Sequence, residues 1–230
     1  MVVTRVVRAA LAVCAVTAFA GCSSDDSPDP DGTITVDTVR NALLKPAEVG
    51  PTWKAPQESA APNQLVSICG ADTAPAGIPG KPQLVAAPLS DEGTEGVQSL
   101  TQLGLVYEDA VSAATALATL RTVADACAPT VSRPAKSGER EEPAYTETAA
   151  TAPLEEGGWI GFVTTRQKQY DKAHPATADV AVAALARGNV VLVDQYAIYR
   201  LGKSGPSANP QFSADWQKLV GTTVKRIGGQ

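Results

Sequence analysis

The single histidine of this 230-residue chain limits the catalytic chemistry that the sequence supports. His174 stands in an Ala-His-Pro segment of a polar stretch, and a Ser-His-Asp or Cys-His centre would have to use it. The chain has no G-x-S-x-G nucleophile elbow, and no H-x-x-x-H or C-x-x-C spacing that would indicate a metal site. We therefore predict an exposed loop histidine, no metal site and no cofactor.

Adjacent carboxylates offer a second route to catalysis, as the acid and base of a glycosidase. The pairs are Glu141-Glu142 and Glu155-Glu156. Neighbouring residues on a strand point to opposite faces, so neither pair would converge on one substrate. The favoured interpretation is solvated loop charge in a protein that is not an enzyme. A hydrolase or transferase that uses Asp or Glu carboxylates is the alternative.

Two candidate ligand-binding residues lie on one predicted strand, residues 190–200. Period-2 alternation places Asp194 and Tyr196 on the same strand face as Leu192 and Ile198. A carboxylate among such neighbours either lines a cleft or lies on a solvated strand face, and both interpretations stay open.

Two further candidates, Arg166 and Tyr170, belong to a local group of basic and aromatic residues that also includes Lys168 and Lys172. Such a group can bind a phosphate or an acidic wall polymer. It can equally form the solvated tip of a β-hairpin.

The first 21 residues have the layout of a secretory signal peptide. Arg5 and Arg8 give a positive start, and the uncharged run 9–21 is shorter than the about 20 residues of a spanning helix. The run ends in Phe19-Ala20-Gly21-Cys22, which resembles the bacterial lipobox, with Phe19 where Leu is usual. We expect cleavage before Cys22 and acylation of that residue. Cleavage elsewhere, in an ordinary signal peptide, is the alternative.

Residues 22–35 consist of the cysteine to be acylated and an acidic, Pro- and Ser-rich stretch that cannot bury enough apolar surface to fold, and we predict that this stretch is a flexible tether. No later stretch is apolar enough to span a bilayer, so the expected membrane contact is the lipid on Cys22, at the outer face of the cell membrane. Without the signal the chain has 17 basic and 24 acidic residues, a net charge of −7. This acidity argues against nucleic acid as a partner.

The remaining cysteines form one possible pair. Cys14 leaves with the signal peptide and Cys22 is acylated, which leaves Cys69 and Cys127. An exported compartment is oxidising enough for these two to form a disulfide, which is the favoured interpretation. Two free buried thiols, or a metal pair, are the alternatives.

Helix and strand signals alternate within the predicted domain, residues 36–230. Helices are predicted over 37–44, 46–50, 110–127 and 209–227. Strands are predicted over 84–89, 99–107, 145–150, 159–167, 178–187 and 190–200. Hairpin connections favour an α+β fold, in which a mainly antiparallel β-sheet is packed by helices in a single disulfide-stapled domain.

Finer predictions concern helix ends and faces. Asp37 and Asp109 are the expected N-caps of the first and third helices. Residues 129–143 are expected to be a charged surface loop. The expected inward face of the third helix consists of Ala110, Ala114, Leu117, Leu120, Ala124 and Cys127.

Several segments carry a family resemblance. They are LLKPAEVG at 43–50, a cysteine in a Pro/Gly-rich loop, VYEDAVSAATALATLRTVADAC at 106–127 and ARGNVVLVDQY at 186–196. With the export signal and tether, which look actinobacterial, the pattern resembles the extracellular sensor domain of mycobacterial PknH-type serine/threonine kinases and the lipoproteins that share it. The resemblance spans roughly residues 36–227, without a kinase domain.

The resemblance implies an α/β domain with a solvent-facing cleft, and a disulfide at Cys127 for which Cys69 is the available partner. The kinase sensors carry a second disulfide, for which this chain has no cysteines. The expected function is that of a lipid-anchored, non-catalytic sensor or ligand-binding domain of the cell envelope, with an envelope ligand or protein as partner. A passive surface or scaffolding lipoprotein is a further alternative.

Overall fold

Seven strands form one antiparallel sheet in the computed structural model, which describes residues 33–56, 64–70, 73–93, 96–137, 142–203, 209 and 211–228. Cys22 and most of the predicted tether lie outside these residues. The strand order is β1-β2-β7-β6-β5-β4-β3. The strands are β1 Gln83–Gly93, β2 Gly96–Val106, β3 Thr130–Arg133, β4 Tyr145–Glu156, β5 Trp159–Tyr170, β6 Ala176–Arg187 and β7 Val190–Leu201.

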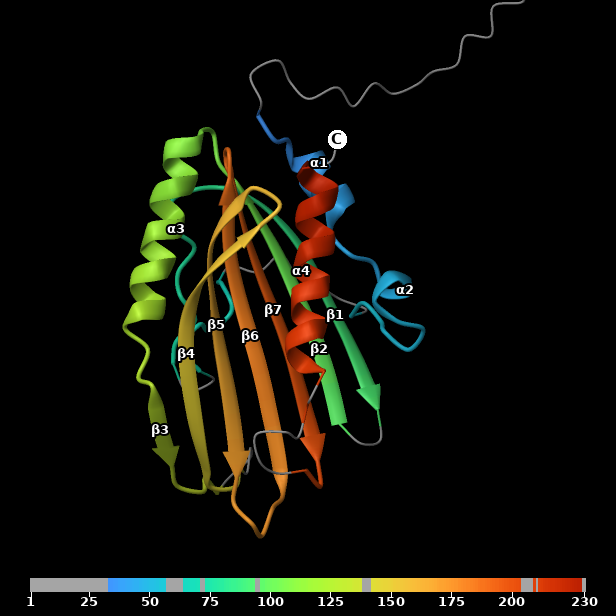
Figure 1. The fold of residues 1–230 in the computed structure, drawn as a ribbon, viewed down its shortest axis with the longest axis vertical. Helices are drawn as coiled ribbons and strands as arrows, with labels where there is room; N and C mark the ends of the chain where they lie inside the picture. The colour runs from blue at the N-terminus through green and yellow to red at the C-terminus, as the bar shows by residue number, and fades with distance from the viewer. Residues whose placement is uncertain are drawn as a thin grey trace, which may run out of the picture.

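Four helices cover the two faces of this sheet (Figure 1). They are α1 Val36–Ala42, α2 Pro46–Val49, α3 Ala110–Asp125 and α4 Phe212–Gly228. Because side chains alternate along each strand, the sheet has two apolar faces and two buried clusters. One cluster holds α1 and α4 against the sheet, and the other holds α3. The predicted α+β class, with a mainly antiparallel sheet, is confirmed.

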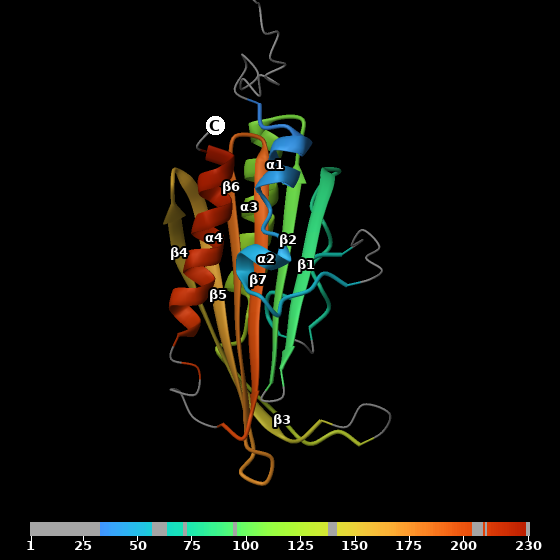
Figure 2. The same cartoon turned by 90° about the vertical axis from the view of Figure 1, so that its right-hand side faces the viewer.

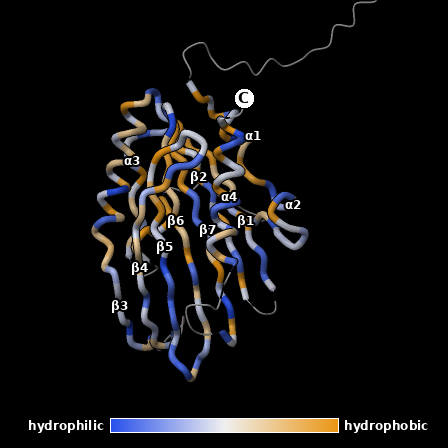
Figure 3. The backbone as a smooth tube through the Cα atoms, viewed as in Figure 1, coloured by the Kyte–Doolittle hydropathy of each residue, from blue (hydrophilic) through white to orange (hydrophobic). Residues whose placement is uncertain are grey.

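Apolar residues concentrate where the helices lie on the sheet (Figure 3). The other end of the central strands, next to β3, is more hydrophilic and extends past α3 (Figures 1 and 3). The first described residues and the C-terminal end of α4 lie at the helix-covered end (Figure 2). Gly104 on β2 lets α1 lie directly on the strand, because a Cβ atom there would collide with Val39.

A two-residue turn, Gly188-Asn189, joins β6 to β7. Gly188 has a φ of 55°, as the turn requires, whereas Asn189 does not take a positive φ. Asn189 instead contributes to the turn region through hydrogen bonds of its side chain. Its Oδ1 accepts a hydrogen bond from Ile34 N at 2.9 Å, and its Nδ2 donates to Ile34 O at 3.1 Å and to Tyr107 O at 2.9 Å. The side chain thus fastens the chain entering α1 to the sheet.

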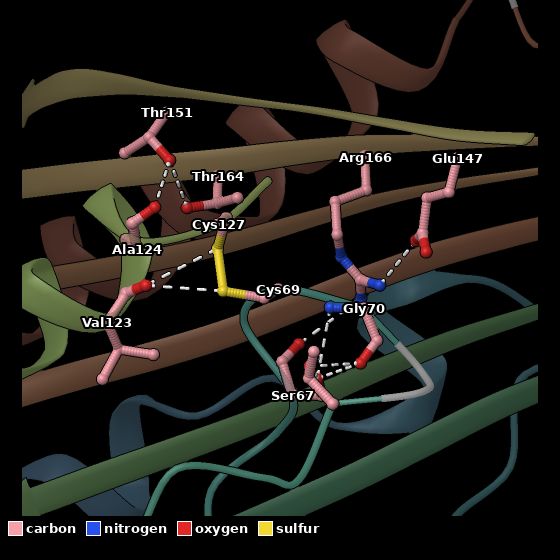
Figure 4. Close-up of a disulfide and its surroundings, with 11 residues drawn as sticks. Ser67, Cys69, Gly70, Val123, Ala124, Cys127, Glu147, Thr151, Thr164 and Arg166 are labelled. Atoms are coloured by element: carbon pink, nitrogen blue, oxygen red, sulfur yellow. Dashed lines mark hydrogen bonds and ion pairs between the residues drawn. A yellow bond between two sulfur atoms is a disulfide. The ribbon is translucent and has the colours of Figure 1, made fainter. Parts of the chain in front are cut away.

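Cys69 and Cys127 form a disulfide, which confirms the favoured interpretation of the pair (Figure 4). Cys127 lies two residues after the end of α3. The bond connects it to Cys69 in the segment 64–70, which lies 58 residues earlier in the chain. Leu65 and Ile68 of this segment are buried in the α3 cluster. The disulfide therefore holds a segment without helix or strand against the sheet.

Three finer predictions are wrong. The side chain of Thr35, rather than Asp37, caps α1 by accepting from Thr38 N, whereas Asp109 caps α3 as predicted. Part of the predicted loop 129–143 pairs with β4 as the short strand β3. The buried residues of α3 are Ala113, Ala116, Leu120 and Ala124, so Ala110 and Ala114 are exposed instead.

Candidate functional site

A cleft of about 200 Å³ lies between the α1–α2 region, the strands β2 and β7, and the helix α4. We call it the α4 cleft. Its apolar lining is Leu44, Val49, Trp53 and Leu219. Its polar lining is Glu48, Gln98, Tyr196, Asp215, Lys218, Thr222 and Arg226. Small-molecule sites are usually apolar with a few convergent polar groups, whereas polar residues form the larger part of this lining.

A buried glutamine, Gln102 of β2, holds the elements of the cleft together. Its Oε1 accepts from Leu44 N at 3.1 Å and from Thr223 Oγ1 of α4 at 3.2 Å. Its Nε2 donates to Leu44 O at 3.2 Å. Because the chain leaves helical geometry at Leu44, these bonds supply partners for backbone groups that a helix would otherwise satisfy. Gln102 thus fixes the spacing between the α1–α2 region and α4.

Two aromatic rings stack against Tyr196, which lines the cleft. The ring centroids of Trp53 and Tyr196 are 6.5 Å apart, and those of Tyr196 and Phe212 are 5.9 Å apart. The Tyr196 hydroxyl donates to Gln98 Oε1 at 2.8 Å. Burial, and to a smaller degree the nearby Asp215 carboxylate, raise the pKa of Tyr196, so its hydroxyl stays protonated and serves as a donor.

An ion pair between α2 and α4 borders the cleft. The Arg226 guanidinium donates to both carboxylate oxygens of Glu48, at 2.9 and 3.1 Å. These hydrogen bonds lower the pKa of Glu48, which is largely solvated. The pair connects α2 to the last turns of α4 and is screened by solvent, so its main effect is geometric.

Asp194 lies beneath α4 on the strand face that it shares with Tyr196, as the alternation predicted. It is 4 % exposed, its Oδ1 has no hydrogen-bond partner, and burial raises its pKa to about 7. It lines a second cavity, too small to hold a water molecule, which we call the Asp194 cavity. Tyr196 and Leu219 line both cavities, so the two spaces meet at these side chains. The solvated-face interpretation of Asp194 is wrong.

The other two candidate ligand-binding residues lie on β5, away from the α4 cleft. Arg166 is buried, donates to Glu147 Oε1 at 2.8 Å and approaches Ser67 O at 3.4 Å, beside the disulfide-held segment (Figure 4). Burial lowers the Arg166 pKa, against the opposing effect of Glu147. The structure therefore separates Arg166 from the cleft that contains Asp194 and Tyr196.

Tyr170 and Lys168 converge on Glu142. The Lys168 ammonium lies 2.6 Å from Glu142 Oε1 and 3.7 Å from the centroid of the Tyr145 ring, and the Tyr170 hydroxyl donates to the same carboxylate at 3.0 Å. Burial raises the pKa of Tyr170. Lys168 is buried, so the solvated-tip interpretation fails for it, as it does for Arg166.

The remaining residues singled out for catalysis do not assemble into a centre. His174 is exposed, as predicted, and contacts only Asp171, at 3.0 Å from Nδ1 to Oδ1, among the interactions that the structure records for it. Glu156 lies at the end of β4 near Lys225, and Glu141 lies outside the described residues. Within the described part of the chain, no three His, Cys, Asp or Glu side chains are placed to hold a metal ion.

Comparisons with known proteins bear on the fold. No protein-family model and no curated protein matches the chain. Among solved structures, the extracellular domain of PknH from Mycobacterium tuberculosis aligns with 86 % of this chain and 98 % of its own, at 15 % identity and a TM-score of 0.52. The chain has a PknH-like fold. At this identity the likeness extends to the fold alone, so the cleft must be judged on its own residues.

Sequence reasoning found part of this site. Asp194 and Tyr196 were identified by alternation along one strand. Gln102 and Trp53 were missed, although a lone amide inside the β-forming run SLTQLGLVY was a detectable signal. The polar α4 residues of the cleft were not identified from the sequence, because the other parts of the lining are distant in the chain.

Proposed function

We propose that this protein is a non-catalytic, extracytoplasmic ligand-binding domain, anchored by lipid at Cys22 to the outer face of the cell membrane. The observation that carries the binding role is the α4 cleft. It combines apolar and aromatic walls with the Gln98 amide, the Tyr196 hydroxyl and charged groups of α4. Small-molecule sites bury a ligand against apolar walls and orient it through polar contacts, and this cleft offers both, with polar groups in the majority.

An enzyme that uses Asp or Glu is the second candidate, and Asp194 is the observation that favours it. A deep carboxylate with a pKa raised to about 7 is a common property of general acids and bases. Among the residues that line its cavity, however, Asp194 is the single carboxyl, and no Lys or His side chain lines the cavity beside it. A glycosidase-type centre needs a second carboxyl group to act with the first. Binding therefore accounts for the geometry better than turnover.

The extracytoplasmic location has independent support. The sequence carries a signal-like segment that ends in Phe19-Ala20-Gly21-Cys22. The neighbour in fold is an extracellular domain. Among the described residues, no helix is both long enough and apolar enough to cross a bilayer. A lipid on Cys22 would supply the attachment, and two or more acyl chains bind a membrane far more firmly than one.

Metabolic labelling with palmitate tests the anchor. The wild-type chain and the Cys14→Ala variant should incorporate label equally, because Cys14 would leave with the signal peptide. The Cys22→Ala variant should incorporate none. Equal label in Cys22→Ala and wild type would contradict lipidation at this position.

A thermal-shift screen of envelope metabolites and wall fragments tests the binding role. A ligand at 100 times its Kd adds about 2.7 kcal/mol of stability. A Thr222→Trp variant should lose this gain, because the new ring fills the α4 cleft.

Thr115→Trp is the matched control for that variant. Thr115 lies on the exposed side of α3, and both threonine hydroxyls donate to the carbonyl four residues earlier. Thr115→Trp should keep the ligand-induced gain. If every compound that stabilises the wild type stabilises Thr222→Trp equally, the cleft is not the binding site. Turnover of an envelope substrate that disappears in Asp194→Asn would replace binding by catalysis.

A further inference from the structure

We propose that the ligand of the α4 cleft is an organic cation, a protonated amine on an apolar body, and that Asp194 is its buried counter-ion. The assignment rests on the ligand-binding role proposed above and specifies its chemistry. It follows from the charges, the aromatic rings and the orphaned carboxylate that surround the two adjoining cavities.

The charge balance around the two cavities is negative. Three carboxylates line them, those of Glu48, Asp194 and Asp215, against two cationic side chains, those of Lys218 and Arg226. Glu48 and Arg226 neutralise each other through two hydrogen bonds. With Asp194 ionised, one negative charge is left over, which a single cationic ligand would balance.

The aromatic lining also selects for a cation. Trp53 and Tyr196 line the cleft, and Trp216 lines the Asp194 cavity together with Tyr196, whose ring is stacked against both Trp53 and Phe212. The face of an aromatic ring is negative, and it attracts an ammonium group placed within about 6 Å of the ring centroid. The same faces repel a carboxylate or a phosphate, so an anionic ligand is disfavoured.

A protonated amine would supply the hydrogen-bond partner that Oδ1 of Asp194 lacks. A buried carboxylate oxygen without a partner is costly, and native structures retain such groups where they serve a function. Oδ1 of Asp194 has no partner in the fold, and it lies behind Tyr196 and Leu219, which separate it from the cleft. Leu219 is only partly buried, and the proposal requires its side chain to rotate, so that the two cavities join and a compact ammonium group reaches Asp194.

A cation beside Asp194 makes binding dependent on pH. The strands on either side present neutral groups, Gln102 from β2 and Ala183 from β6. From α4, Asp215 and Lys218 face the cleft, and the Glu48–Arg226 pair lies farther along it. Burial is the cause of the raised pKa of Asp194, so the side chain is largely neutral below pH 6 and charged above pH 8. Amine affinity should rise across this interval.

Three probes of matched size test the assignment: hexylammonium, hexan-1-ol and hexanoate. Each is titrated into the ¹⁵N-labelled protein and followed by the amide resonances of Gln98 and Thr222. At pH 8 hexylammonium should bind at least 10-fold more tightly than hexan-1-ol, and hexanoate more weakly than either. At pH 5.5 the advantage of the amine over the alcohol should fall to about 2-fold, because the carboxyl of Asp194 is then protonated.

Two variants identify the counter-ion. Asp194→Asn should remove the amine advantage at pH 8 and leave the binding of hexan-1-ol unchanged. Asp125→Asn, an exposed site on α3 with the same change of charge, should keep the advantage.

Each remaining outcome decides against one proposal or both. Equal binding of the three probes in the cleft, a preference for hexanoate, or an amine advantage that survives Asp194→Asn would overturn the cation assignment while leaving a ligand-binding cleft. If none of the probes gives a saturable shift at the cleft, the cation assignment and the ligand-binding role both fail.

Discussion

Replacement of Asp194 by asparagine should stabilise this protein at neutral and alkaline pH. The carboxyl is buried under α4, one oxygen has no hydrogen-bond partner, and no cationic side chain offsets its charge. Asparagine has nearly the same shape and carries no charge. The substitution therefore removes the cost of ionising a buried group and changes little in the packing.

The magnitude follows from the difference between the folded and unfolded pKa. The folded pKa is about 7, against an ordinary value of 3.8. Between these values the unfolded chain is ionised while the folded protein keeps its proton, so the free energy of unfolding falls as the pH rises. One pKa unit is worth 1.36 kcal/mol, which makes the full penalty about 4 kcal/mol above pH 8. Below pH 3.8 the penalty vanishes.

Urea unfolding between pH 4 and pH 9, without reductant, measures this difference. Near pH 4 the variant and the wild type should have similar free energies of unfolding, because both side chains are then neutral in the fold. At pH 8 the variant should be more stable by about 3 to 4 kcal/mol. Between pH 4 and pH 7 the free energy of unfolding of the wild type should fall, relative to that of the variant, by about 1.4 kcal/mol per pH unit.

Asp179 provides the control. It is a buried aspartate on the same face of the sheet, but its carboxylate accepts a hydrogen bond from Gln167 at 2.9 Å and another from Asn209. Asp179→Asn should therefore destabilise the protein at pH 8, by about 1 to 3 kcal/mol. Parallel stability curves for Asp194→Asn and the wild type across the whole pH range would refute the reasoning, since they would mean that Asp194 is ordinarily ionised in the fold.

Three other substitutions should destabilise. Cys127→Ser opens the disulfide loop and should cost about 4 kcal/mol, measured by urea unfolding without reductant. Gln102→Leu leaves both backbone groups of Leu44 without their partner; it should cost about 3 kcal/mol and speed hydrogen exchange of the Leu44 amide at least about 10-fold. Arg166→Met leaves the buried carboxylate of Glu147 without its cationic partner and should lower the free energy of unfolding by about 3 to 5 kcal/mol at pH 8. Adding Glu147→Leu should recover much of this loss.

Each of these has an outcome that would contradict it. An unchanged urea midpoint in Cys127→Ser would mean that the bond is absent in the native protein. An unchanged exchange rate at Leu44 in Gln102→Leu would mean that the amide does not hold this segment. Additive losses in the Arg166 and Glu147 double variant would mean that the two side chains do not interact.

The sequence predicted elements well where large apolar side chains mark a face. In α4 the residues Phe212, Trp216 and Val220 recur at helical spacing, and all three are buried. In α3 most candidate core residues are alanines, which occur on every side of the helix and carry little directional information. The predicted face was therefore rotated, and Ala113 and Ala116 are buried instead of Ala110 and Ala114.

The site was predictable only in its local part. Alternation along β7 correctly placed Asp194 and Tyr196 on one face. The depth of Asp194, however, is set by α4, which begins 18 positions later in the chain. The partners of Gln102 are 58 and 121 residues away, and Arg166 pairs with Glu147 across the β4–β5 hairpin, 19 residues back in the chain. Long-range packing, and not residue type, decides which polar residues become buried.

The hydrogen bonds between Asn189 and Ile34 also affect how the domain responds to force. Two hydrogen bonds join this side chain to the N–H and the carbonyl of Ile34, at the point where the chain enters the fold. Tension applied to the preceding residues is therefore shared by two bonds that act in parallel, and it passes into the β6–β7 turn at the centre of the sheet before it can unwind α1. The domain would bear such a load through its most extensively paired strands.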